Sequence, residues 1–300
     1  MAKYRSGVMP PLATPFKNEQ MDLEAFKSNL DTYNQTGMTG YLVLGSNGEA
    51  AYLSKEEKQA LIAAAREVTP EDRFLLVGAG AESSQAAIED STEAARLGAD
   101  AVLVLPPCYY KGLMDDQRLA MHYKRLADNC PIPVMIYNMP ANTGLNLSAA
   151  LVGELAAHPN IMGIKDSSGN MLQLSEIVRL TKDEHFTTIV GASPMLYPAL
   201  CLGAAGGILA VANVLPNICV TIFEAFQAGD HAEALALHQK LTKLAMLVTS
   251  GWGVPGLKHA MNKSGYDGGN VRSPLTDLTD SAKKDIIEAE LGILLPLENR

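Results

Sequence analysis

The sequence predicts an α/β protein, a closed (β/α)8 TIM barrel with a C-terminal helical extension. The first observation is that short apolar runs alternate with helical stretches, which is typical of repeated βα units. The second is that several of these runs are apolar at consecutive positions, as expected for parallel strands that are covered on both faces. The third is their number, eight, which favours a closed barrel over an open doubly wound sheet.

The predicted strands lie at 8–13, 41–44, 74–77, 101–105, 134–137, 162–165, 188–190 and 207–211. An open sheet would be expected to carry a nucleotide-binding fingerprint. The nearest candidate, the segment 78–83 (Gly-Ala-Gly-Ala-Glu-Ser), lacks the third glycine of that motif. We therefore interpret this segment as an ordinary turn between a strand and a helix.

Helix signals lie between the strands. Leu23, Phe26 and Leu30 are spaced as on one helix face, and Asp22 precedes them as an N-cap. Ser54 opens a capping box with the glutamate three residues later. These signals predict that the strands are joined by helices, as the barrel requires.

The pattern is helical after residue 215. Helices are predicted at 218–227, 231–249 and 281–291, with a break at 251–256 (Gly-Trp-Gly-Val-Pro-Gly). No evident linker sequence lies between this helical part of the chain and the barrel. The sequence thus predicts a barrel over residues 1–215 and a helical extension over residues 216–300.

Composition excludes several classes of partner. The formal net charge is -9, which argues against nucleic acid and anionic membranes. No apolar run is long enough to span a bilayer. The segment before the first predicted strand is too short for a signal peptide, so we expect a cytoplasmic location.

The chain shows no pattern for a metal or a disulfide. Its four cysteines are scattered without a CxxC pair, which favours reduced thiols (Cys108, Cys130, Cys201 and Cys219). Its six histidines show no ligand spacing such as H-x-x-x-H. We therefore expect neither a metal nor a cofactor.

A lysine ends the sixth predicted strand, and a turn sequence (Asp-Ser-Ser-Gly) follows it. For a lone lysine, a strand end that emerges into water is the favoured interpretation, because lysine is rarely buried. The alternative is an amine held in a poorly hydrated pocket, where the uncharged form can act as a nucleophile. The surroundings of Lys165 decide between these two interpretations.

A tyrosine, Tyr137, ends the fifth predicted strand. Consecutive strands of such a barrel are neighbours about 4.8 Å apart, and active sites lie at their C-terminal ends. Tyr137 and Lys165 are therefore expected side by side at the mouth of the barrel. Alone, Tyr137 would be a rim aromatic with its hydroxyl in water; beside an amine it can move protons.

The second strand is followed by Gly45-Ser46-Asn47-Gly48-Glu49. Its glycines allow close approach of the backbone, and successive N–H groups in such a turn can bind an anion. Gly45, Ser46 and Asn47 are thus candidates to hold a small carboxylate, although a plain turn would also explain the motif. A carboxylate held across the barrel from Lys165 would fit a 2-oxo acid. The loops after strands seven and eight lack a phosphate cradle, so we expect a substrate without phosphate.

Three motifs together resemble one family. G-x-x-G-E after strand two, Y-N-x-P from Tyr137 and G-x-K-D around Lys165 look like the dihydrodipicolinate synthase and N-acetylneuraminate lyase family. These are class I pyruvate aldolases on (β/α)8 barrels. The resemblance covers nearly the whole chain, and it implies pyruvate as the small-molecule partner and a homo-oligomer, a tetramer or dimer.

The resemblance also implies roles for individual residues. Lys165 would be the Schiff-base lysine, Tyr137 the proton-transfer phenol and Ser46 a hydroxyl in the proton relay. Asn47 would lie in the loop that grips the pyruvate carboxylate. The remaining implied site residues are Tyr110, lent to a neighbouring subunit's site, and Ile208, whose backbone lines the pocket.

The chain departs from the family pattern at two places. Dihydrodipicolinate synthases carry an arginine two residues after the proline of Y-N-x-P, where it binds the carboxylate of the aldehyde partner; this chain has Asn142. Lysine-inhibited members often carry histidines where this chain has Lys55 and Lys58. The stretch around Asn142, together with the stretches around Ser46 and Tyr110, is most similar to the 4-hydroxy-2-oxoglutarate aldolase branch of the family.

The sequence therefore predicts a metal-independent lyase that cleaves a 4-hydroxy-2-oxo acid, such as 4-hydroxy-2-oxoglutarate, to pyruvate and an aldehyde. Backbone N–H groups, or Ser167 and Ser168 after the lysine, would then hold the distal carboxylate of the substrate. The alternatives are 4-hydroxy-tetrahydrodipicolinate (dihydrodipicolinate) synthase, which condenses pyruvate with aspartate semialdehyde, and a 2-keto-3-deoxy sugar-acid aldolase. A barrel that senses pyruvate without turnover is a further alternative of another class.

Overall fold

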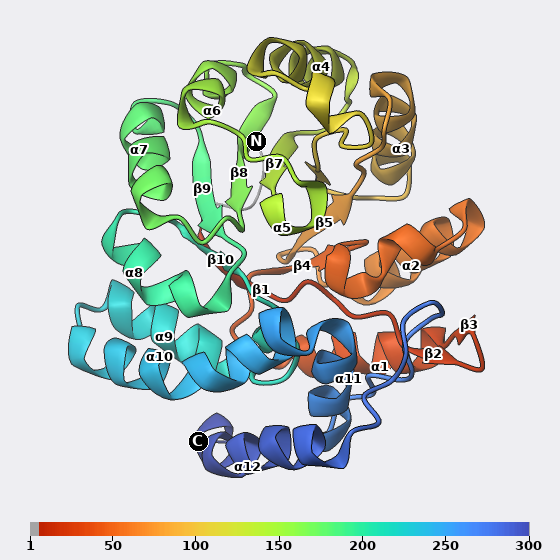
Figure 1. Ribbon diagram of the computed structural model, residues 1–300, viewed down its shortest axis with the longest axis vertical. Coiled ribbons are helices and arrows are strands. Elements are labelled where there is room, and N and C mark those ends of the chain that lie inside the picture. The colour runs from red at the N-terminus through yellow and green to blue at the C-terminus, as the bar shows by residue number, and fades with distance from the viewer. Residues whose placement is uncertain (1–5, 300) are drawn as a thin grey trace.

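The computed structural model describes residues 6–299 and has the predicted architecture (Figure 1). Eight parallel strands form one sheet in the order β1-β10-β9-β8-β7-β6-β5-β4. The strands are β1 Gly7–Met9, β4 Gly40–Val43, β5 Phe74–Gly78, β6 Ala101–Val104, β7 Val134–Asn138, β8 Ile161–Asp166, β9 Thr187–Val190 and β10 Gly206–Ile208. A parallel bridge between Pro11 and Leu42 joins the two ends of the sheet, so the barrel closes beside β1 and β4.

Helices surround the strands. They are α1 Leu23–Tyr33, α2 Lys55–Val68, α3 Ser84–Arg96, α4 Asp116–Asn129, α5 Pro140–Thr143, α6 Ala149–Ala156, α7 Met171–Thr181, α8 Leu196–Cys201, α9 Pro216–Gln227, α10 His231–Met246, α11 Gly253–Lys263 and α12 Ser281–Glu298. A short antiparallel hairpin, β2 Phe16–Lys17 and β3 Gln20–Met21, precedes α1. The Asp22 N-cap and the Ser54 capping box are both present.

The helical extension lies on one side of the barrel, where α10, α11 and α12 pack together (Figure 1). The division of the chain at residue 215 stays a prediction; α9, which follows that point, packs against β1 and α8. None of the described helices is long and apolar enough to cross a membrane.

The predicted break at 251–256 was wrong for most of its length. The chain passes from α10 through a π-helical turn, Leu247–Gly251, and α11 begins at Gly253. Pro255 falls in the first turn of α11, where its missing N–H leaves no helical hydrogen bond unmade. The glycines and proline that suggested a loop therefore mark the start of a helix that the sequence did not predict.

The first and last barrel strands are shorter than predicted. β1 ends at Met9 because Pro10 and Pro11 have no N–H to continue the ladder. β10 ends at Ile208, and the residues predicted to continue it enter a 3₁₀ turn, Ala210–Asn213. The buried Asn213 amide donates to Pro11 O and Ala210 O, which holds these two strand ends together.

A separate apolar cluster fills the barrel interior. It contains one or two side chains from nearly every strand: Met9, Leu42, Phe74, Leu76, Ala101, Leu103, Met135, Tyr137, Ile189 and Ile208. Alternate residues of a strand face the same side, so Met135 and Tyr137 both enter this cluster from β7. The packed interior supports the residues at the C-terminal ends of the strands.

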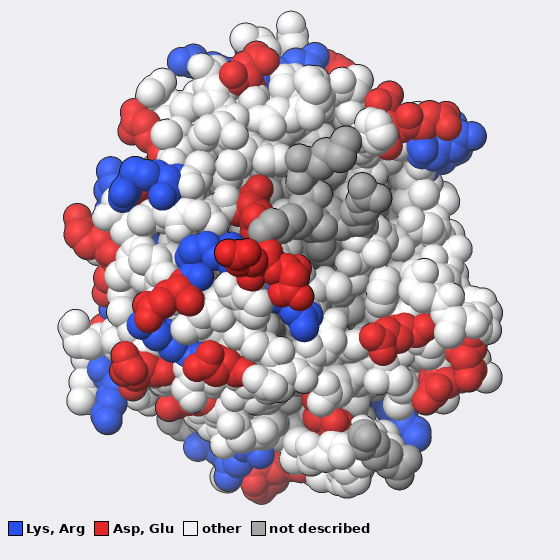
Figure 2. Space-filling model, turned by 180° about the vertical axis from the view of Figure 1, so that it is seen from behind, with Lys and Arg blue, Asp and Glu red and all other residues white. Residues whose placement is uncertain are grey.

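Charged side chains of both signs are interspersed over the face of the molecule shown in Figure 2. Among the described residues drawn there, the basic side chains form no continuous surface, and the formal net charge of the chain is -9.

Candidate active site

The pairing of β7 with β8 places Tyr137 directly opposite Lys165. Both residues are buried, with exposed fractions of 5% and 3%. Lys165 Nζ lies 4.2 Å from the centroid of the Tyr137 ring, over its face. The interpretation of Lys165 as a strand end in water is therefore wrong, and the structure has the alternative arrangement, an amine in a poorly hydrated position.

The hydroxyl of Tyr137 is hydrogen-bonded within a polar cluster. Burial alone would raise the pKa of Tyr137, but the charge of Lys165 and hydrogen bonds to Ser46, Lys165 and Ser167 lower it below its ordinary value. Ser46, which follows the second predicted strand, and Lys165 and Ser167, which end and follow the sixth, thus all lie next to the Tyr137 hydroxyl. A phenol with a lowered pKa gives up its proton more readily, as a proton shuttle requires.

The loop 45–49 has a constrained backbone. Ser46–Gly48 form a 3₁₀ turn between Leu44 and Glu49, and both of these flanking residues have positive φ, 59° and 55°. Left-handed backbone at non-glycine residues costs on the order of 1 kcal/mol and is concentrated at functional sites. The candidate carboxylate loop is therefore held in a conformation that the surrounding structure must support.

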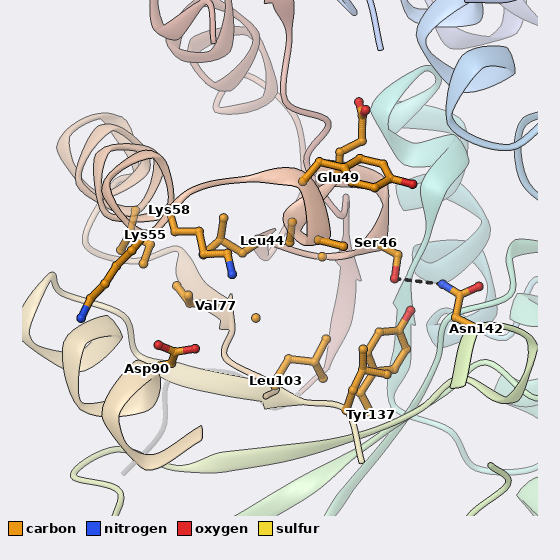
Figure 3. A pocket seen from close by; sticks show the side chains of 18 of the residues that line it. Leu44, Ser46, Glu49, Lys55, Lys58, Val77, Asp90, Leu103, Tyr137 and Asn142 are labelled. Carbon is orange, nitrogen blue, oxygen red and sulfur yellow. Dashed lines mark hydrogen bonds between the residues drawn. The ribbon is translucent and has the colours of Figure 1, made fainter. Parts of the chain in front are cut away.

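A pocket of about 410 Å³ lies at this mouth, lined by Gly45, Ser46, Tyr137, Asn142 and residues of α2 and α3 (Figure 3). Asn142 comes from α5, and its Nδ2 donates to Ser46 Oγ at 3.5 Å. The position at which the family has an arginine is thus occupied by a neutral amide that already contacts Ser46.

The same pocket extends between α2 and α3, where Lys58 points into it and where Lys55 and Asp90 also line it (Figure 3). Burial raises the pKa of Asp90, and the charges of Lys58 and Lys55 oppose this. The pocket therefore has a second, charged end away from Tyr137.

The other predicted residues lie outside the lining of this pocket: Lys165, Ser167 and Ser168, which lie in β8 or follow it, and also Asn47, Ile208 and Tyr110. Asn47 is half-buried in the 3₁₀ turn, and Ile208 is buried in the barrel interior. Tyr110 is 68% exposed and packs edge-to-face against Tyr109, so the structure does not bring it to Tyr137. Its predicted place in a neighbouring subunit's site stays a prediction.

A buried network behind the site was not predicted. Asn138 Nδ2 donates to Asp166 Oδ1 at 2.7 Å, and Ser168 Oγ donates to Asp166 Oδ2 at 2.7 Å. Asn138 and Asp166 follow Tyr137 and Lys165 directly and form the next pair of the ladder. The network therefore fixes the ends of both strands, and Ser168 is occupied there and not directed at a substrate.

Gly191, after β9, was also missed. A Cβ at this position would lie 1.9 Å from Ser167 Oγ and 2.7 Å from Lys165 Cε. Only glycine leaves room for the Lys165 side chain in this position. Its place directly after a predicted strand was the only signal in the sequence.

The side chains that commonly bind metal ions in proteins are those of His, Cys, Asp and Glu. Among residues 6–299, no three His, Cys, Asp or Glu side chains are grouped so that they could hold a metal ion. All four cysteines are free, and two of them, Cys130 and Cys219, are buried.

Comparison with known proteins gives one consistent family. The model of the dihydrodipicolinate synthetase family matches residues 4–290. A protein of Methanoculleus marisnigri named 4-hydroxy-tetrahydrodipicolinate synthase is 39% identical over 284 residues, covering 93% of this chain and 96% of its own. A protein of Methanosphaerula palustris with the same name is 40% identical over 277 residues, covering 91% of this chain and 94% of its own.

Solved structures agree. A prophage protein of E. coli K12, YagE, belongs to the dihydrodipicolinic acid synthase family and was solved in complex with pyruvate. It superposes with a TM-score of 0.90 at 31% identity, over 96% of this chain and 98% of its own. The curated relatives carry the name of the alternative activity and not that of the 4-hydroxy-2-oxoglutarate aldolase branch, so their names do not support the branch to which the motifs were assigned.

Proposed function

Because the chain belongs to the dihydrodipicolinate synthetase family, a family of class I pyruvate-dependent aldolases, we propose that Lys165 forms a Schiff base with pyruvate and that Tyr137 moves the protons. The observation that carries this proposal is the buried Lys165 amine over the face of Tyr137, at 4.2 Å. Ser46 would relay protons to Tyr137, and the Gly45–Asn47 backbone would hold the pyruvate carboxylate.

The reaction follows from these positions. Lys165 Nζ attacks the 2-oxo carbon, and loss of water gives an iminium. The iminium withdraws electrons, so a proton leaves C3 to give an enamine. The enamine carbon then attacks an aldehyde carbon, and the aldehyde oxygen takes a proton from Tyr137. Water adds to the iminium that this leaves, which releases the product and frees Lys165. Cleavage of a 4-hydroxy-2-oxo acid is the same sequence in reverse.

Borohydride reduction in the presence of pyruvate tests the first step. We expect a three-carbon adduct on the peptide that contains Lys165, and none in Lys165→Arg. An adduct on another lysine, or no adduct in the wild-type protein, would refute the Schiff base. Turnover of substrate separates an enzyme from a barrel that captures pyruvate without further reaction.

For the aldehyde partner, the first candidate is aspartate semialdehyde. The support is the name that the relatives at 39% and 40% identity carry, 4-hydroxy-tetrahydrodipicolinate synthase. The protein would then condense pyruvate with the semialdehyde, and the product would cyclise.

Asn142 favours a second candidate, cleavage of a 4-hydroxy-2-oxo acid: a 2-keto-3-deoxy sugar acid, whose distal end is neutral, or 4-hydroxy-2-oxoglutarate, whose distal carboxylate backbone N–H groups or Ser167 would have to hold. An arginine here would bind a distal carboxylate by charge-assisted hydrogen bonds worth about 1.5–3 kcal/mol each. The amide of Asn142 is neutral and already donates to Ser46. The loss of one such hydrogen bond corresponds to roughly one to two orders of magnitude in preference for aspartate semialdehyde.

Comparing kcat/KM for the three substrate types in wild type and Asn142→Arg separates the candidates. A wild-type preference for aspartate semialdehyde supports the first and refutes the second. A preference for 4-hydroxy-2-oxo acids that Asn142→Arg shifts toward the semialdehyde supports the second. If Asn142→Arg leaves the ranking unchanged, position 142 does not select the substrate.

The exposed pair Tyr109 and Tyr110 supports a homo-oligomer as a further part of the proposal. Their exposed fractions are 78% and 68%, unusually high for two adjacent aromatic side chains. Light scattering of wild type and Tyr110→Ala measures the assembly, and a monomeric wild type would refute it.

A further inference from the structure

A buried ion pair lies directly beneath the candidate carboxylate loop. Lys258 Nζ, from α11, lies 2.6 Å from Glu49 Oε1, and the two side chains are only 2% and 1% exposed. Glu49 is the last residue of the loop, and its carboxylate points away from Ser46 and Tyr137 (Figure 3). The pair therefore connects the loop to the helical extension.

The pair is part of a larger network. Lys258 Nζ also donates to Thr14 O at 2.7 Å and to Asn270 O at 2.5 Å, so the ammonium contacts two backbone carbonyls besides the carboxylate. Glu49 Oε2 accepts from the backbone N–H of Arg272 at 2.8 Å. Two segments of the extension, around residues 258 and 270–272, thus hold the same carboxylate.

The network reaches the loop backbone by two routes. Glu49 N–H donates to Ser46 O at 3.1 Å within the 3₁₀ turn. Thr14 donates its hydroxyl to Gly48 O at 2.7 Å, and Thr14 O is itself an acceptor of Lys258. A displacement of Glu49 therefore displaces the turn that carries Ser46 and Asn47.

The network around Lys258 and Glu49 is also connected to α2. Arg272 forms a bidentate pair with Glu57 at 2.7 Å for both hydrogen bonds and donates to Tyr52 O at 3.0 Å. The Arg272 guanidinium and the Lys258 ammonium both lie over the ring of Phe16, at 4.3 and 4.6 Å from its centroid. The extension thus holds both ends of the segment that runs from the loop to α2.

We propose that Lys258 and Glu49 are positioning residues, through which the helical extension holds the Gly45–Glu49 loop in the conformation that binds the carboxylate of pyruvate. This inference rests on the proposed function of that loop. Neither side chain contacts the substrate. A buried ion pair stabilises a fold little more than apolar side chains of the same size would, because desolvation offsets the attraction between the charges. The strained backbone at Leu44 and Glu49 gives this ion pair a role, because that conformation must be stabilised by specific, directional contacts.

The test separates positioning from stability by three variants. Lys258→Met leaves a buried carboxylate unpaired, and we expect it to lower Tm and to raise KM for pyruvate about 10- to 100-fold, the effect of a loop displaced by about 1 Å. The double variant Glu49→Gln/Lys258→Met removes both charges, so Tm should recover while KM stays raised. Leu291→Ala in the core of the extension is the control; it should lower Tm with KM within about threefold of wild type.

Two readouts are measured on each protein, the pyruvate concentration that half-saturates borohydride trapping and the hydrogen exchange of the peptide containing residues 45–49. We expect faster exchange of this peptide in Lys258→Met and in the double variant, and not in Leu291→Ala. A double variant with wild-type KM and exchange, or a control that raises both as much as Lys258→Met does, overturns the proposal. If Lys258→Met does not fold, Glu49→Gln alone is measured in the same way.

The proposed function can fail separately. If wild type forms no adduct on Lys165, Schiff-base capture is refuted, whereas the exchange measurement still decides whether Lys258 and Glu49 hold the loop. If wild type forms the adduct and the variants do so at unchanged pyruvate concentration, only the positioning role is refuted.

Discussion

Replacement of Gly191 by alanine tests the position of Lys165 most directly. The added Cβ would lie 2.7 Å from Lys165 Cε and 1.9 Å from Ser167 Oγ. Carbon atoms in contact lie about 3.5–4.0 Å apart, so Lys165 must move by about 1 Å or the Gly191 backbone must yield. A 1 Å displacement of a reacting group costs about 10²-fold, and we expect that loss in the rate of pyruvate capture by Gly191→Ala.

The assay is single-turnover borohydride trapping of pyruvate, with peptide mass spectrometry to place the adduct. Gly292→Ala is the matched control, because a Cβ on this glycine of α12 meets nothing within 4 Å. Ser167→Ala in the Gly191→Ala background removes the nearer clash and leaves the one with Lys165, so we expect the defect to persist. Capture by Gly191→Ala within about threefold of wild type would refute the need for glycine beside Lys165, since the predicted loss is about 10²-fold.

Three further outcomes are expected. Tyr137→Phe should form the Lys165 adduct but lose about 10²–10⁴ in turnover, because one hydroxyl is removed at little change in volume; turnover within about threefold of wild type would exclude Tyr137 from proton transfer. Burial raises the pKa of Glu298 to about 7 from 4.5, against the backbone N–H groups of Ile218 and Asn217. The native state therefore binds this proton more tightly than the unfolded chain does, so stability should fall as pH rises from about 4.5 to 7, by up to about 3 kcal/mol. Glu298→Gln should remove that dependence in urea unfolding at pH 5 and pH 8, and an unchanged dependence would contradict the assignment. EDTA should leave turnover unchanged, and a loss that zinc or manganese restores would point to a metal-assisted aldolase.

The pairing of Tyr137 with Lys165 could be predicted because it depends on few assumptions. Each residue ends an apolar run, consecutive runs become neighbouring parallel strands, and their C-terminal ends meet at one mouth. The register that sets them directly opposite follows from the same geometry. Ser46 could be placed near them because its loop follows another strand of the same barrel.

Gly191 and Lys258 could not be predicted, for two different reasons. A glycine has no side chain, so its role at Lys165 lies in the absence of a Cβ and leaves no chemical signal in the sequence. Lys258 is paired with Glu49, which lies far from it in the sequence, and it belongs to α11, whose first turn is rich in glycine and proline. That composition predicted a break, and a lysine close to it gave no reason to expect burial.

Two buried lysines make the chemistry of the site clearer than either does alone. Lys258 donates to two backbone carbonyls and forms an ion pair with a carboxylate, so its nitrogen is engaged in holding the fold. Lys165 is as deeply buried, yet within residues 6–299 no carboxylate forms an ion pair with it. The carboxylate nearest in sequence, Asp166, is engaged by Asn138 and Ser168 instead. A nucleophile needs a nitrogen that is free to form a bond, and a positioning cation needs one that is not. The same residue type at similar burial therefore fits two different proposed roles, capture of a 2-oxo acid at position 165 and support of the loop at position 258.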